Sequence, residues 1–99
     1  MMTHQDEVAA MDRLRRALLA FQTAQNHLLD AERRLKGLPQ AEVDAFWNGL
    51  GRRLEANMRA TATEAVAAFR QFSAVGLVAG AADRHLVTQA QRHLAEGSA

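Results

Sequence analysis

Hydrophobic residues recur every three or four positions along the first third of the chain, which is the period of an amphipathic helix. The spacings of three, four, three, seven and seven residues make a heptad stripe, with polar Gln25 and Glu32 at two of its seam positions. Thr3 with Asp6 resembles a helix start signal. The pattern predicts a helix over residues 5–36, packed through Met11, Leu14, Leu18, Phe21, Leu28 and Leu35.

A second apolar stripe begins after Pro39, a residue that is tolerated in the first turn of a helix. Some of its members lie eleven residues apart, close to three helical turns, so this stripe should supercoil little. Gly49 and Gly51 interrupt it, and each costs about 1 kcal/mol relative to alanine in a helix. We expect a helix over residues 39–73 with a break at 48–51. Its apolar face is formed by Val43, Phe46, Leu50, Leu54, Met58, Ala65, Phe69 and Phe72.

The remaining segment carries a minimal stripe of Leu86, Ala90 and Leu94, preceded by Gly76 and Gly80. Either the second helix continues through these glycines, or a separate helix spans residues 81–95. The position of the main turn is also open, because Gly37 and Pro39 form one candidate and the break at 48–51 another.

The fold class that follows is all-α: a long antiparallel helical hairpin, alone or with a third, shorter C-terminal helix, in one domain of residues 1–99. Hydrophobic residues make up 48% of the 99 residues, but many are alanines, which bury little area each. Because chains of this size have a small core, we expect dimerisation to complete a helical bundle.

The charge pattern argues against nucleic acid as a partner. The formal net charge is +1, and no segment is strongly basic. Three arginine pairs recur at intervals of 18 and 19 residues, a spacing that suits a basic stripe for phosphate or acidic partners. The simpler interpretation is a solvated face balanced by Asp12, Asp30 and Glu55. The pairs are Arg15 with Arg16, Arg33 with Arg34, and Arg52 with Arg53.

No combination of residues in the sequence predicts catalysis, and we expect neither an enzyme, a cofactor nor a small-molecule substrate. The chain has no cysteine, and its histidines lack the neighbours that a metal site needs. The N-terminal segment is not a standard signal peptide, and the longest uncharged nonpolar run is too short for a membrane span. These features predict a cytoplasmic protein. The histidines are His4, His27, His85 and His93.

Trp47 is the only tryptophan and lies near the middle of the chain, followed by Asn48 and Gly49. This tripeptide resembles the tryptophan-x-glycine motif of the ESAT-like small helical-hairpin proteins exported by type VII secretion. That resemblance implies a hairpin bend at the motif, pairing into a four-helix bundle and export without a signal peptide. Two features depart from the family. Gly37 and Pro39 indicate a break before the motif, and the chain has no tyrosine for the C-terminal export signal.

The function expected from these observations is a non-catalytic helical protein–protein interaction module, resembling a small secreted helical-hairpin dimer. Its partner is a second copy or a different chain, and Trp47 at the bend is a candidate contact, because tryptophan is enriched in interface hot spots. The alternative is an unrelated cytoplasmic helical adaptor, chaperone or assembly subunit. A small nucleic-acid-associated regulatory protein ranks below both.

Overall fold

The computed structural model describes residues 3–97, over which the chain forms four helices: α1 (His4–Leu35), α2 (Gln40–Asn48), α3 (Leu50–Ala74) and α4 (Ala81–Glu96). The predicted helices over 5–36, 39–73 and 81–95 are confirmed to within one residue, and the expected break falls at Gly49. The C-terminal helix is separate from α3. The predicted domain bounds, 1 and 99, lie outside the described residues.

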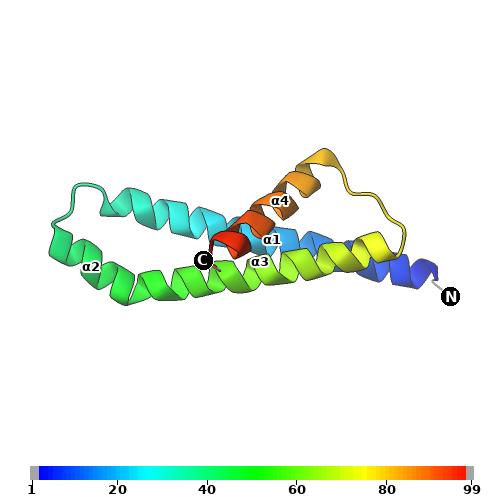
Figure 1. The fold of residues 1–99 in the computed structure, drawn as a ribbon, viewed down its shortest axis with the longest axis horizontal. Coiled ribbons are helices and arrows are strands. Elements are labelled where there is room, and N and C mark those ends of the chain that lie inside the picture. The colour runs from blue at the N-terminus through cyan, green and yellow to red at the C-terminus, as the bar shows by residue number, and fades with distance from the viewer. Residues whose placement is uncertain (1–2, 98–99) are drawn as a thin grey trace.

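The chain reverses direction between α1 and α2, where Gly37 adopts a left-handed φ of 82° that favours glycine. The Pro39 carbonyl then accepts the first hydrogen bonds of α2, from the amides of Glu42 and Val43 at 3.0 and 3.2 Å. Figure 1 shows α2 leading into α3, which runs back alongside α1. Of the two candidate turns, the one at 37–39 is the main one, within the connection over residues 36–39, while Gly49 only interrupts the returning arm.

The start of α1 and the end of α3 each carry a capping motif. Thr3 and Asp6 form a capping box, in which the Thr3 amide donates to Asp6 Oδ2 at 2.8 Å and the Asp6 amide donates to Thr3 Oγ1 at 3.2 Å. At the end of α3 the amides of Gly76 and Leu77 donate to the carbonyls of Ser73 and Phe72. This is a Schellman motif, and Gly76 has the φ of 86° that it requires.

The seam of α1 includes buried alanines that lie one position before residues 11, 18, 25 and 32 of the predicted stripe. Its buried members include an alanine every seventh residue, and Met11 is 47% exposed. Leu14, Leu18 and Phe21 are buried as predicted, whereas Leu28 and Leu35 are half-buried. Three alanines of α3 are also fully buried, so small side chains from both helices fill the seam. The alanines are Ala10, Ala17, Ala24 and Ala31 of α1, and Ala62, Ala65 and Ala68 of α3.

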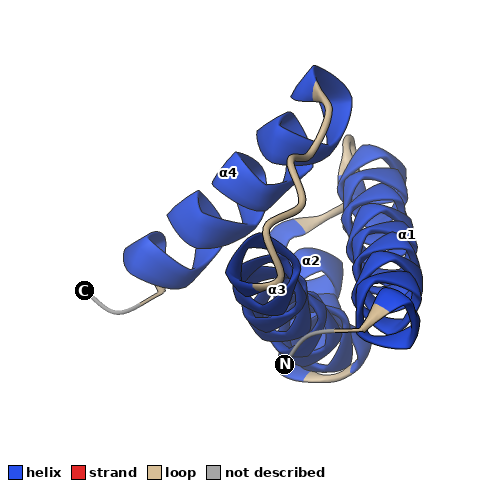
Figure 2. Cartoon of the chain, turned by 90° about the vertical axis from the view of Figure 1, so that its right-hand side faces the viewer, coloured by secondary structure: helices blue, strands red, loops and turns tan. Residues whose placement is uncertain are grey.

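Helix α4 packs mainly on α3, at an angle to the α1–α3 pair (Figure 2). Gln25 of α1 faces it, since its Nε2 donates to Gln89 Oε1 of α4 at 3.1 Å. Val87 and Ala90 of α4 are buried and join Leu18 of α1 in the hydrophobic core. Polar Gln25 therefore belongs to the contact with α4. Ala24 is buried in the seam in place of Gln25.

The hydrophobic core occupies only part of the molecule. Of the second stripe, Ala65 and Phe72 belong to the core, and Met58 and Phe69 pack against it. Leu54 and the apolar residues before it do not. The molecule measures 58 × 24 × 20 Å, with a radius of gyration of 16.3 Å, compared with about 13 Å for a typical chain of this length. The end of the hairpin beside the 36–39 turn therefore consists of α1 and the α2–α3 arm, without α4 (Figure 1).

Candidate interaction surfaces

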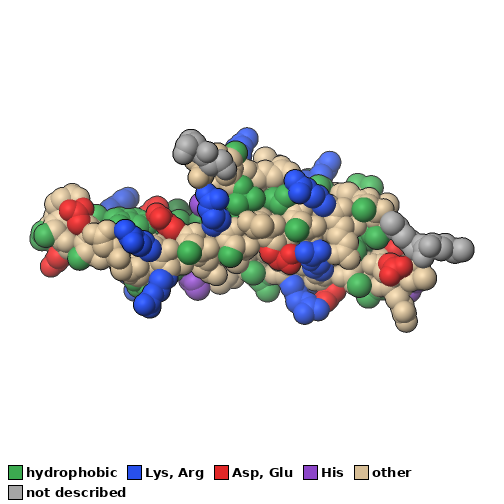
Figure 3. Space-filling model, turned by 60° about the horizontal axis from the view of Figure 1, so that its bottom comes forward, with side chains coloured by type: hydrophobic (Ala, Val, Ile, Leu, Met, Phe, Trp, Pro, Cys, Tyr) green, Lys and Arg blue, Asp and Glu red, His purple; other side chains and the backbone are tan. Residues whose placement is uncertain are grey.

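The end of the hairpin beside the 36–39 turn carries an open groove of about 360 Å³ between α1 and the α2–α3 arm. Leu38 and Leu50 are 44% and 56% exposed there, and Leu35, Phe46 and Leu54 are half-buried. In Figure 3, hydrophobic side chains are visible along the whole face of the molecule, this end included. We call the site the hairpin-end groove. It is lined by His27, Asp30, Ala31, Arg34, Leu35, Leu38, Phe46, Leu50 and Leu54.

One wall of the hairpin-end groove is held by the two aromatic rings of α2. Phe46 and Trp47 meet edge to face, with ring centroids 5.1 Å apart and planes at 82°. Both cover Gly51, which is buried, and a Cβ at Gly51 would lie 2.5 Å from Trp47 Cε3. The glycine predicted as a turn residue therefore lies in α3 and makes room for Trp47. Trp47 supports Phe46 and does not itself line the groove.

The polar edge of the hairpin-end groove carries charges of both signs. Arg34 Nη2 lies 3.0 Å from Asp30 Oδ2, one helical turn away, and the two side chains are 80% and 57% exposed. Such an exposed pair contributes little to folding, because water solvates both charges. Both groups are therefore available to another molecule at the groove.

A second groove, of about 350 Å³, lies between α1, the 78–80 segment and α4. Buried Leu14, Leu18 and Phe72 are among its lining residues. Its exposed edge includes apolar side chains, since Leu19 and Val78 are 65% and 87% exposed, beside the polar Arg15, Gln22 and Asp83. Met11, expected in the helix seam, belongs to this edge. Neither Leu19 nor Val78 was predicted from the heptad pattern, since each falls outside the stripe.

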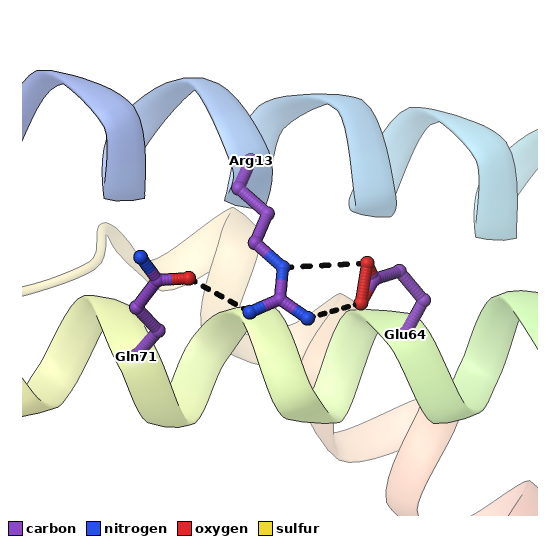
Figure 4. Close-up of polar contacts among 3 residues, drawn as sticks. All are labelled: Arg13, Glu64 and Gln71. Atoms are coloured by element: carbon purple, nitrogen blue, oxygen red, sulfur yellow. Dashed lines mark hydrogen bonds and ion pairs between the residues drawn. The ribbon is translucent and has the colours of Figure 1, made fainter.

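Outside both grooves, Arg13 joins α1 to α3 (Figure 4). Its guanidinium forms two contacts with the Glu64 carboxylate, one of them from Nε to Oε2 at 3.3 Å, and Nη1 donates to Gln71 Oε1 at 2.7 Å. The hydrogen bond from Arg13 holds the pKa of Glu64 below its usual value of 4.5, against a smaller opposing effect of burial. The sequence gives no periodic signal for this contact, which joins residues 51 positions apart.

Because the pKa of Glu64 is lowered by folding, its charge stabilises the fold above about pH 4.5, and this contribution is lost as the pH falls through the lowered value. We expect Glu64→Gln to unfold more readily than the wild type at pH 7. The difference should shrink as the pH falls below about 4.5 and vanish once the pH lies below the lowered pKa of Glu64. Urea unfolding of both proteins across this pH range measures the difference in their free energies of unfolding. Glu55→Gln, at an exposed site on the same helix, is the control. A difference independent of pH would contradict the assignment.

The other predicted candidates lie on the surface. All three arginine pairs are exposed, and Arg16 and Arg34 contact Asp12 and Asp30 within α1. This favours the balanced, solvated face over a basic stripe. Within residues 3–97, no group of three histidine or acidic side chains could hold a metal ion. None of the helices described in this range is long and apolar enough to cross a membrane.

Comparison with known proteins adds no relative, since the chain matches no protein-family model, no curated protein and no solved structure. The candidate surfaces therefore rest on the geometry and chemistry of this chain.

Proposed function

We propose that this protein is a non-catalytic helical protein–protein interaction module that binds a helical partner in the hairpin-end groove. The observation that carries the proposal is that the apolar residues of the second stripe near the turn are left partly exposed. Phe46, Leu50 and Leu54 have the spacing of one helix face, yet they lie outside the core and border an open groove. Apolar side chains in this arrangement gain free energy when another apolar surface covers them.

The shape and chemistry of the groove favour a helix as its occupant. Two helical walls, one of which carries Leu50 and Leu54 at successive turns, form the kind of hollow into which an amphipathic helix lays its apolar face. Asp30 and Arg34 at the edge can pair with charges that flank such a face. The presence of both signs makes a polyphosphate chain a poorer fit, because Asp30 would repel it.

The proposal does not depend on the resemblance to the type VII secretion proteins. That family bends at its tryptophan-x-glycine motif, whereas this chain reverses at 36–39 and carries Trp47 inside α2. The layout of an adaptor or assembly subunit, with a short third helix on a hairpin, fits the structure more closely. In either role the partner is a second copy or a different helical chain.

Site-specific crosslinking in the native host tests the proposal. A photo-crosslinking amino acid at position 50 should give a discrete protein adduct, because Leu50 borders the groove and is exposed. The same amino acid at position 63, exposed on α3 and outside the groove, is the control. The mass of the adduct distinguishes a second copy from another protein. If position 50 gives no more adduct than position 63, the groove is not a docking surface.

A further inference from the structure

We infer that the occupant of the hairpin-end groove is the same groove of a second copy of this chain, related to the first by a two-fold axis. This inference rests on the proposed function and commits it to one partner. Three features of the described residues carry it: the extent of the surface, the shape of the apolar patch and the order of the charges along α1.

The surface area exceeds that of a compact monomer by more than a standard dimer interface buries on each partner. The chain exposes 6851 Å². A compact monomer of 10.9 kDa is expected to expose about 5,600 Å², which leaves an excess of about 1,250 Å². A stable interface of standard size buries about 800 Å² on each partner. The elongated hairpin therefore has enough surplus surface for one such interface.

The apolar patch carries both a hollow and the side chains that could fill one. Leu38 and Leu50 are about half exposed at its border, while Leu35 and Leu54 lie deeper within it. A two-fold interface uses the same patch on both subunits and therefore needs one that is complementary to itself. With this geometry, the exposed leucines of each copy enter the groove of the other.

The charges on α1 have the same self-complementary order. Asp30 and Arg34 lie one turn apart on one face of the helix, both at the edge of the groove. A two-fold axis that passes beside α1 at residue 32, perpendicular to the helix, makes the two copies of α1 antiparallel neighbours. It places Asp30 of each copy beside Arg34 of the other. The ion pair now formed within α1 then becomes two ion pairs between copies, in surroundings with less water.

The test is sedimentation equilibrium of the purified full chain, with a charge exchange on α1. The wild type should sediment at twice the 10.9 kDa of one chain. Asp30→Arg alone and Arg34→Asp alone place like charges opposite each other and should each raise the dissociation constant about tenfold or more. The double variant Asp30→Arg/Arg34→Asp restores opposite charges and should dimerise nearly as well as the wild type.

Mixing the two single variants gives the sharpest result. One copy then has arginine at both positions and the other aspartate at both, so a mixed dimer should form where neither variant pairs with itself. The matched control exchanges Asp12 and Arg16, a pair of the same spacing on the same helix but outside the groove. This exchange should leave the dimer unchanged. Circular dichroism verifies that each variant is folded.

A wild type that stays monomeric at several hundred micromolar would overturn the inference, as would single variants that dimerise normally or a mixture that stays monomeric. If position 50 crosslinks to a different protein, the occupant of the groove is not a second copy, and the inference is wrong. The proposed function, binding of a partner in this groove, would still be supported. Loss of the adduct altogether would instead count against both.

Discussion

Replacing Phe21 with alanine is expected to lower the free energy of unfolding by about 3–5 kcal/mol. Phe21 is the largest fully buried side chain in the described part of the chain, and it belongs to the core shared by α1, α3 and α4. Its removal takes away buried apolar area and leaves a cavity that the three helices cannot close without moving. Urea unfolding at a fixed protein concentration measures the effect, because self-association would make stability depend on concentration.

The control for this prediction is Met11→Ala. Met11 belongs to the same predicted stripe, but it is 47% exposed, so its replacement should change the free energy of unfolding by less than about 0.5 kcal/mol. Leu18→Ala, at a buried site in the same core, should cost about 2–5 kcal/mol. If Phe21→Ala and Leu18→Ala both cost less than about 0.5 kcal/mol, α1 does not pack as described.

Replacing Ala65 with leucine is expected to destabilise the protein by about 1–3 kcal/mol, although leucine is apolar and a good helix former. Ala65 lies in the seam between α1 and α3 with no exposed surface. The added carbons of leucine would force the two helices apart or into poor rotamers. From the apolar pattern alone, the larger side chain should stabilise the protein. The sign of the change in the free energy of unfolding therefore distinguishes the apolar pattern from the close packing of α1 and α3 as the basis for the expected result.

Ala60→Leu is the matched control, because Ala60 lies on the same helix and is exposed. Its effect should stay within about 0.5 kcal/mol of the wild type. Both variants can be compared by urea unfolding at the same protein concentration. A stabilised Ala65→Leu variant would show that the seam has room for a larger side chain, and the close approach of α1 and α3 would then be wrong.

The helices were predictable because their signals are local. A stripe that recurs every three or four residues, a capping box at Thr3 and glycines after residues 36 and 75 each act within one or two helical turns. These signals placed the helix ends to within a residue. They could not decide between Gly37 and Gly49 as the main turn, because both are glycines between apolar stripes.

The candidate surfaces were only partly predictable. Phe46, Leu50 and Leu54 are expected in a packed seam, but they border an open groove between α1 and the α2–α3 arm, and no residue of α4 lines that groove. Leu38, in the turn, belongs to no stripe, so periodicity gives it no role. Arg13 and Glu64 lie on different helices, and their pairing follows from the register of α1 against α3.

By itself, the sequence determined an all-helical chain with two long arms and a short third helix, because helix propensity, capping and apolar spacing are properties of neighbouring residues. Only the tertiary structure decided which residues of each stripe are buried. Alanines every seventh residue define the α1 seam because their small side chains let α3 approach, and Met11 is left outside. Burial depends on the distance and register between helices, and these are set by contacts between distant parts of the chain.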